Sequence, residues 1–413
     1  MIIWGGGGGS RLVRAEGHNG AVALDYLTDL ARVGQYLRHP VRAALWWQLI
    51  REDASVLDQL RRALLPLPFD GEPVVPDDLF PPPRDLAPVW QGRKVVVVAT
   101  GGSGALASTV GVVRALGEAG VTPSGYGLCS GSTMFGIPLA AGMSTDEVAR
   151  ALITLRASDY LDPEWLRLAT APLRLGRGWA GLMRGEAVEE AFRRLLGDIT
   201  LGDLDVPVWF PAWSIEENRL RYVSSVDDPN LSAARAVRMA VALPLAFEPV
   251  EYEGQSYLDG GIVEILPSRP FVEPGACDVA VVVNGFYRPG FHADEDYRWR
   301  ESPFSLIRVS GQTRLMGHVD TARRSLADLT ATAEVHMLDP VPYGKVHGAG
   351  LYTEFVDRRE WPAYIRSGYD AAREVLERLP ADDAGPVEAP LGRRRGSSGV
   401  SAGSRSLARS PRS

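Results

Sequence analysis

Two short segments of the chain carry residue types that could cleave an acyl ester. Ser130 lies in Leu-Cys-Ser-Gly-Ser-Thr, directly after a predicted strand, and Asp259 lies much later in Leu-Asp-Gly-Gly. A sharp turn from a strand into a helix exposes one side chain to substrate. We expect the Ser130 hydroxyl to attack the ester. Such an attack needs a base to accept the hydroxyl proton, and the carboxylate of Asp259 is one candidate.

Both residues also have purely structural explanations. Serine is favoured at helix N-caps for hydrogen bonding alone, and Asp-Gly is among the commonest turn pairs. Cys129 invites a thiol nucleophile, but adjacent residues on a strand point to opposite faces, so we expect this thiol in the core. A Ser-His-Asp triad stays open, because His292 and His347 lie in predicted loops.

A glycine-rich turn, Thr100-Gly-Gly-Ser-Gly104, follows the first predicted strand of the main domain. Residues without side chains let backbone N–H groups approach a ligand. Gly101, Gly102 and Ser103 could therefore form an oxyanion hole for the charge that develops on the substrate. A phosphate-binding loop is the alternative, but the sequence has neither Gly-Lys-Ser/Thr nor a three-glycine nucleotide fingerprint.

The elements that must position these groups alternate between strand and helix. The unbroken β-branched run at 94–99 is typical of a strand covered on both faces. A helix is predicted at 106–119, ended by Gly120, and a second strand at 121–129. This alternation predicts a three-layer α/β fold. Further strands are expected at 206–215, 220–224, 277–283 and 333–338, and further helices at 131–141, 232–241, 304–327 and 363–379.

Four segments, in this order, resemble the patatin-like phospholipase family, which shares its core with the calcium-dependent cytosolic phospholipases. The first, Gly101-Gly102 with Gly111-Val-Val-Arg-Ala-Leu116, resembles the glycine-rich oxyanion loop and its helix. The second, Leu128-Cys-Ser130-Gly-Ser-Thr133, resembles the nucleophile turn. The third, Arg238-Met-Ala-Val-Ala-Leu-Pro244 with Phe247 and Pro249, resembles the helix and turn that lead to the aspartate, and the fourth, Asp259-Gly-Gly261 with Pro267, resembles the aspartate motif.

The resemblance implies a patatin-like α/β/α sandwich and a two-residue dyad of Ser130 and Asp259, in which Gly131, Gly260 and Gly261 support the two motifs. The chain also departs from the family at five positions. Most members have glycine two residues before and after the serine, a third glycine in the oxyanion loop followed by a basic residue, and an asparagine before the later proline. The corresponding residues here are Leu128, Ser132, Ser103, Ala105 and Ile265.

The sequence predicts three regions. Apolar residues at three- and four-residue spacings, followed by many prolines, predict an N-terminal helical extension and proline-rich linker over 1–90. The acyl hydrolase domain is expected at 91–380. The remainder, 381–413, carries six arginines and no acid from Leu391 onward, and its Ser-, Gly- and Arg-rich composition predicts a disordered basic tail.

Composition narrows the possible partners and compartment. A net charge of −7 argues against nucleic-acid binding, which depends on clustered cations. Only two cysteines, Cys129 and Cys277, are present, and both lie in apolar stretches, as expected in a reducing compartment. No apolar run is long enough to span a membrane, and the first residues do not form a signal peptide. We expect a cytoplasmic protein that associates peripherally with membranes and needs no metal or cofactor.

Substrate class is inferred from 156–192, where tryptophans and leucines alternate with arginines. This mixture is typical of a lid over an acyl-binding cleft or of a face that rests on an anionic membrane. A helical pair packed on the sheet is the structural alternative. Three functions remain open: a lipid acyl hydrolase of phospholipase A or lysophospholipase type, an acyltransferase or thioesterase-like enzyme with the same dyad, and a catalytically impaired lipid-binding protein.

Overall fold

The computed structural model describes residues 75–83, 86–102, 104–155, 162–163, 180–286, 305–342 and 358–380, with the side chains of the sixth range from 317 onward. Several predictions lie outside these residues: Ser103, the N-terminal helices, most of the arginine-rich 156–192 segment, His292, His347 and the basic tail. Within the described ranges, no helix has the length and apolar character needed to cross a bilayer.

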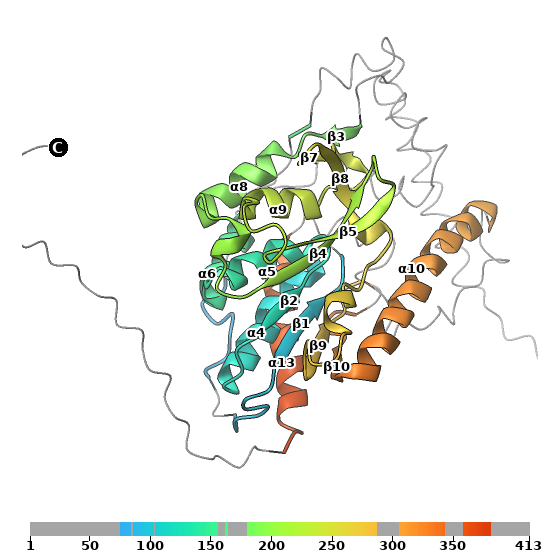
Figure 1. Ribbon diagram of the computed structural model, residues 1–413. Helices are drawn as coiled ribbons and strands as arrows, with labels where there is room; N and C mark the ends of the chain where they lie inside the picture. Colours follow the sequence, from blue (N-terminus) through green and yellow to red (C-terminus); the bar gives the residue numbers. More distant parts are fainter. Residues whose placement is uncertain are drawn as a thin grey trace, which may run out of the picture.

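An eight-stranded mixed sheet forms the centre of the fold (Figure 1). Its strands follow the order β10-β9-β1-β2-β4-β8-β7, and β5 pairs with β4. The strands are β1 (Val95–Ala99), β2 (Gly125–Gly127), β4 (Val208–Ser214), β5 (Arg219–Ser224), β7 (Val250–Tyr252), β8 (Gln255–Asp259), β9 (Val279–Val283) and β10 (Glu334–Leu338). A second, two-stranded sheet pairs β3 (Gly181–Met183) with β6 (Leu245–Phe247).

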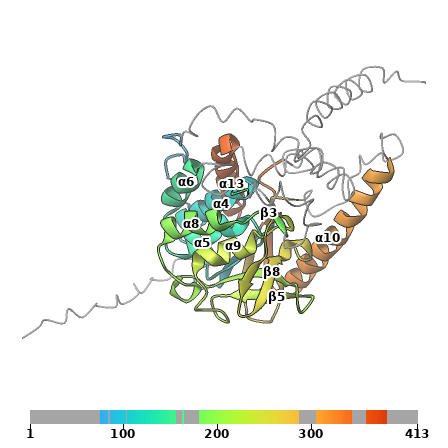
Figure 2. The same cartoon turned by 90° about the horizontal axis from the view of Figure 1, so that it is seen from above.

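Helices cover both faces of the large sheet (Figure 2). Val97 of β1 belongs to the apolar cluster that contains buried residues of α4, α5, α9 and α13. Its neighbours Val96 and Val98 belong to a second cluster, with Ala322 and Leu329 of α10. The predicted three-layer α/β/α fold is therefore confirmed. The helices are α4 (Ser108–Glu118), α5 (Ser132–Ala140), α6 (Thr145–Thr154), α8 (Glu186–Leu196), α9 (Ala233–Ala240), α10 (Ser305–Thr332) and α13 (Trp361–Leu376).

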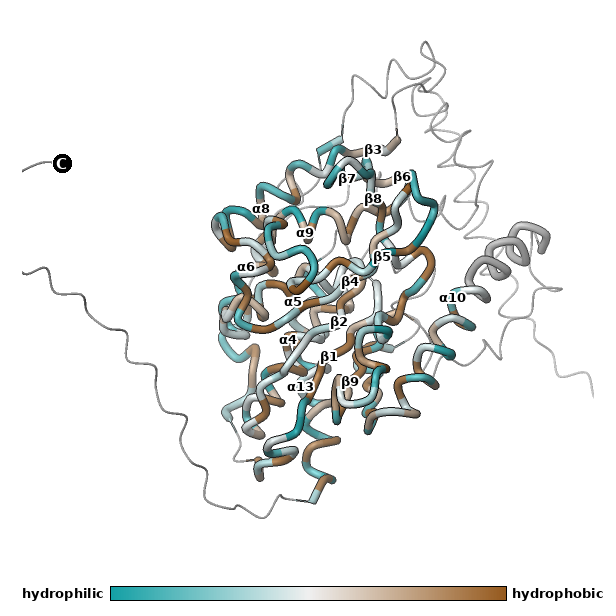
Figure 3. The backbone as a smooth tube through the Cα atoms, in the orientation of Figure 1, coloured by the Kyte–Doolittle hydropathy of each residue, from teal (hydrophilic) through white to brown (hydrophobic). Residues whose placement is uncertain are grey.

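The central strands β1 and β9 have the composition expected of strands buried on both faces. Their sequences, VVVVA and VAVVV, are buried at every position, and both strands lie in the hydrophobic part of the tube in Figure 3. They pair in parallel along their whole length. Parallel strands end at the same edge of a sheet, so the loops that follow them meet there.

Element boundaries differ from the sequence predictions at several places. The strand expected at 121–129 is confined to Gly125–Gly127. Pro123, which has no N–H to donate to a neighbouring strand, precedes it, and the sharp turn at Ser130 follows it. The helix expected at 106–119 is divided into a short 3₁₀ turn and α4. The 3₁₀ turns are η1 (Gly104–Ala107), η3 (Leu201–Asp203), η4 (Gly260–Ile262), η5 (Arg269–Phe271) and η8 (Arg358–Glu360).

Candidate active site

Ser130 occupies a sharp turn between β2 and α5. Its φ angle is 52°, in the left-handed region that residues other than glycine seldom adopt. Leu128 extends the strand by donating its N–H to the Trp209 carbonyl at 2.8 Å, and α5 begins two residues after the serine. Strained backbone of this kind is concentrated at functional sites. The serine is 9% exposed, so only a small part of it is open to solvent.

Hydroxyl groups on the first turn of α5 hold this strained backbone. The Ser132 hydroxyl accepts a hydrogen bond from the Cys129 N–H at 2.6 Å and lies 2.8 Å from the Cys129 carbonyl, to which it donates. The Thr133 hydroxyl donates to the Ser130 carbonyl at 2.6 Å. A serine at a position where the family usually has glycine therefore fastens the turn.

The second departure near the serine is accommodated by the helix. Leu128 is fully buried, and it lies directly against Gly136, one turn into α5. A Cβ atom added to Gly136 would lie 2.4 Å from Leu128 Cδ2 and 3.0 Å from Leu128 Cγ. A leucine can therefore replace the glycine that most family members have at this position, because Gly136 has no side chain where Leu128 packs.

Gly136→Ala should destabilise the fold by about 1–3 kcal/mol, because the new methyl group overlaps a leucine that has no free space to enter. Gly117→Ala in α4 is the matched control, since nothing lies within 4 Å of its added Cβ. That control should stabilise the helix by up to about 1 kcal/mol. Denaturant unfolding measures both, and Leu128→Ala should reduce the cost of Gly136→Ala. Equal stabilities of the two alanine variants would contradict the steric argument.

Asp259 ends β8 in a buried position, 1% exposed. Its Oδ1 accepts the Gly261 N–H at 2.8 Å, and its own N–H donates to the Ala242 carbonyl at 2.9 Å. A hydrogen bond also joins its carboxylate to the Ser130 side chain. The structure thus brings together the two side chains that the sequence proposes as a dyad.

Strand β4 explains how two residues so distant in sequence meet. β5 pairs with β4 from Trp209 to Ser214 and fills one of its edges. β2, parallel, and β8, antiparallel, must therefore share the other edge, where Gly127 pairs with Trp209 and Asp259 pairs with Ala212. Because β2 and β8 run toward each other along this edge, the serine turn and the aspartate converge between them.

Burial raises the pKa of Asp259 from 3.8 to about 6, while hydrogen bonds from Ser130 and Gly261 lower it by less. The carboxylate is therefore ionised at neutral pH and can accept a proton. Burial also raises the pKa of the Cys129 thiol well above its usual value, and the nearby Asp259 and Glu264 charges add to this rise. Cys129 is fully buried, with its sulfur 3.5 Å from the Glu264 carbonyl, so the prediction of a core cysteine is confirmed.

The glycine-rich turn lies beside the serine turn. The Gly101 N–H donates to the Ile265 carbonyl at 2.9 Å, so this amide is already engaged by the protein. The amides of Gly102 and Gly131, by contrast, donate no hydrogen bond to a described residue. A Cβ atom on Gly102 would lie 3.0 Å from the Gly285 carbonyl oxygen, which explains the glycine there. Ser103 lies outside the described residues.

Two side chains near the Asp259 turn carried no signal in the sequence. His318 of α10 donates to the Ile262 carbonyl, and burial lowers its pKa. The buried Glu264 accepts the Tyr222 hydroxyl at 2.6 Å and forms an ion pair with Arg269 at 2.5 Å. Neither His318 nor Glu264 bonds to the serine or aspartate. These two side chains instead fix the loop that follows Asp259. Their role is visible only from their contacts in the folded structure.

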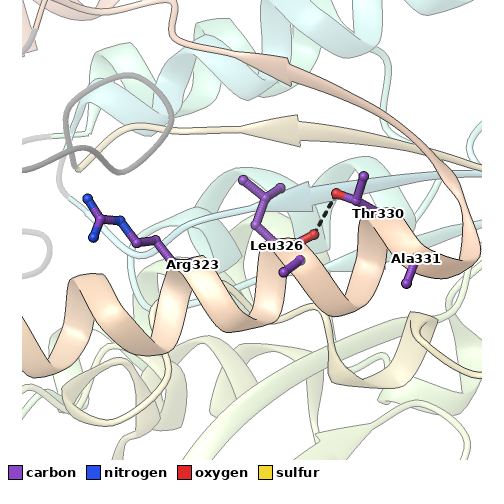
Figure 4. Close-up of a pocket in the computed structure, with 5 residues that line it drawn as sticks. Arg323, Leu326, Thr330 and Ala331 are labelled. Carbon is purple, nitrogen blue, oxygen red and sulfur yellow. Dashed lines mark hydrogen bonds between the residues drawn. The ribbon is translucent and has the colours of Figure 1, made fainter.

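An open recess elsewhere on the surface is not part of this site. It lies along α10 and is lined by Arg323, Leu326, Ala327, Thr330 and Ala331 (Figure 4). The Thr330 hydroxyl donates to the Leu326 carbonyl at 2.6 Å and is thereby occupied. In the part of the chain that the structure describes, no cluster of three His, Cys, Asp or Glu residues could hold a metal ion.

Comparison with known proteins identifies the domain that contains this geometry. Residues 96–272 match the model of the patatin-like phospholipase family. This domain belongs to the patatin-like phospholipase family. An uncharacterized NTE family protein of Mycobacterium tuberculosis is 28% identical to the chain over 308 residues, which cover 72% of the chain and 81% of that relative.

Other similar proteins extend the comparison. Lysophospholipase NTE1 of Cryptococcus neoformans is 23% identical over 351 residues, and the match covers 82% of the chain but only 20% of that protein. Among solved structures, VipD from Legionella pneumophila aligns with a TM-score of 0.37 and 16% identity, covering 71% of this chain and 70% of its own. The human GIVD cytosolic phospholipase A2 aligns with a TM-score of 0.39 and 11% identity, covering 69% and 58%.

Proposed function

We propose that this patatin-like protein is a lipid acyl hydrolase, which cleaves carboxylic esters through an acyl-enzyme formed on Ser130. One observation carries the proposal. A serine held in strained backbone is hydrogen-bonded to a buried, ionised aspartate at the point where two strands converge. A structural serine needs neither the strain nor the carboxylate.

In the proposed reaction, Ser130 Oγ attacks the carbonyl carbon of the ester as Asp259 accepts the hydroxyl proton. Collapse of the tetrahedral intermediate expels the alcohol, which takes that proton from Asp259. A water molecule then gives a proton to Asp259 and attacks the acyl-enzyme, and the proton returns to Ser130 as the fatty acid leaves. A pKa of about 6 suits Asp259 to both directions of this transfer at neutral pH.

We assign the oxyanion hole to the amides of Gly102 and Gly131, with Ser103 as a third candidate. The first two donate to no described residue and flank the serine turn. Gly131 directly follows the nucleophile, the position that supplies an oxyanion donor in other serine hydrolases. Gly101 then has a different role from the one expected, because its bonded amide shapes the turn rather than facing the substrate.

The substrate class is proposed from the family and from the relatives' names. The family is named for phospholipases, and one similar protein is a lysophospholipase. We therefore propose a phospholipid or lysophospholipid ester as substrate, and peripheral contact with the membrane that contains it. The cytoplasmic location and the independence from metals and cofactors stay predictions.

Serine-directed labelling tests the proposal. A fluorophosphonate probe should modify Ser130 in the folded protein and should fail to label Ser130→Ala, with mass spectrometry identifying the adduct. The labelled site should then be compared with products released from a mixed lipid extract. Release of free fatty acid supports hydrolysis, whereas acyl transfer to an added alcohol or amine favours a transferase. An unlabelled Ser130 would favour a lipid-binding protein without activity.

A further inference from the structure

Leu245 has a backbone conformation that is unusual for a leucine. In the described part of the chain, five residues other than glycine have positive φ: Trp90, Ser130, Asn218, Leu245 and Glu253. Asn218 and Glu253 lie in the turns of the β4–β5 and β7–β8 hairpins. Trp90 is buried and its ring lies 5.0 Å from the His336 ring. Ser130 is the proposed nucleophile. Leu245, the fifth, also lies in a turn, but at a position that seldom holds a leucine.

The strain at Leu245 arises in a tight turn between α9 and β6. The Leu243 carbonyl accepts the Ala246 N–H at 3.1 Å, Pro244 occupies the second position, and Leu245 has a φ of 70° in the third. Proline followed by a residue of positive φ is typical of a type II turn. The third position of that turn normally holds glycine or asparagine, because a Cβ is disfavoured there.

The leucine does not offset this strain by packing inside the protein. Its exposed fraction is 48%, and it is one of four large apolar side chains with substantial exposure in the described part of the chain. An exposed leucine in left-handed backbone lowers the stability of the fold in two ways: its backbone is strained, and its apolar side chain is exposed to water. Such outliers persist where function requires them.

The turn is also firmly held and lies close to the dyad. The Ala242 carbonyl accepts the Asp259 N–H at 2.9 Å, and Leu245 follows three residues later, so its backbone lies within about 11 Å of that bond. The buried Arg238 guanidinium donates to the Glu248 carbonyl at 2.5 Å and to the Arg184 carbonyl, which fastens β6 to the β3 segment. Leu245 therefore projects from a rigid support.

We infer that the Leu245 side chain contacts the acyl chain of the ester and sets the preference for long over short chains. This inference rests on the proposed function and adds a specificity-determining residue to it. An acyl chain bound at Ser130 extends away from the dyad, and an exposed leucine on a braced turn gives it an apolar surface. A glycine or asparagine would relax the turn but would lose that contact.

Leu245→Asn tests the inference, because asparagine tolerates positive φ and removes the apolar surface. We expect kcat/KM for a monomeric p-nitrophenyl decanoate to fall about tenfold relative to that for the butanoate, a difference of about 1.4 kcal/mol. Turnover of the butanoate should stay within about twofold. Val226→Asn is the control, since Val226 is 64% exposed but follows the β5 end that pairs with the start of β4, away from Asp259.

Two results would overturn the inference: an unchanged ratio of kcat/KM between the two esters, whether or not both values fall, or a loss seen only on esters carried in phosphatidylcholine vesicles. The last would assign Leu245 to membrane contact. Binding gives a readout without turnover: in the Ser130→Ala background, Leu245→Asn should weaken decanoate binding about tenfold by calorimetry. A wild-type protein that binds decanoate through Leu245 but hydrolyses no ester would overturn the proposed function and leave this inference standing.

Discussion

Ser130→Ala lowers kcat/KM for ester hydrolysis by at least about a thousandfold and leaves the fold intact, if the serine is the nucleophile. Loss of the hydroxyl removes the acyl-enzyme route, while alanine adds no atom to the crowded turn between β2 and α5. Asp259→Asn should have an effect of the same order, because an amide cannot accept the proton although it keeps the shape of the carboxylate.

A matched control separates chemistry from stability. Ser144→Ala removes the N-cap of α6, whose hydroxyl accepts the Glu147 N–H at 3.2 Å. It should cost about 1 kcal/mol of stability without changing turnover. Steady-state kinetics with circular dichroism and thermal unfolding measure all three variants. Near wild-type turnover in either dyad variant would reject the two-residue mechanism.

The pH dependence of kcat/KM should show a single acidic limb centred near pH 6. Only the ionised carboxylate of Asp259 accepts the serine proton, and burial raises its pKa to about 6. Below that value kcat/KM should fall about tenfold per pH unit, reaching about a hundredth of its plateau at pH 4. Initial rates on a soluble ester between pH 4 and 8 measure it. A limb near pH 4 would mean that the acting carboxylate is not buried.

The raised pKa of Asp259 also makes the stability of the fold depend on pH. Stability should fall as pH rises, whereas kcat/KM should increase. Because the pKa of Asp259 is higher in the folded protein than the unfolded value of 3.8, the folded state binds this proton more tightly. Ionisation therefore destabilises the fold: the cost is absent below about pH 4 and complete above about pH 6, at most about 3 kcal/mol. Asp259→Asn lacks this cost, so its unfolding free energy relative to wild type should rise from pH 4 to pH 7.

The central strands could be predicted because their amino-acid composition alone indicates burial on both faces. The valine runs at β1 and β9 have the composition that a strand buried on both faces requires, and the alternation of strands and helices then predicted the layers. The short strands β7 and β8 lacked that pattern and were missed. Their residues are partly exposed, and their pairing with each other and with β4 decides their structure.

The candidate site was predictable only in part. The turns that contain Ser130 and Asp259, together with the family resemblance, indicate these two residues. Nothing in their local sequence indicates that they lie next to each other. Contacts between distant segments could not be inferred at all. The Ile265 carbonyl removes the Gly101 amide from the candidate oxyanion donors, and Gly136 accommodates Leu128. Both facts depend on which backbone and side-chain atoms approach each other in the folded chain.

The shared edge of β4 makes the geometry of the dyad independent of the length of chain between its members. Insertions or deletions in the loops between β2 and β8 would leave the carboxylate in place, as long as both strands keep their partners on β4. A shift of β8 by a single residue, however, would turn the Asp259 side chain to the opposite face of the sheet and away from the serine. New loops could therefore diversify substrate access during evolution, whereas the alignment of three strands could not change.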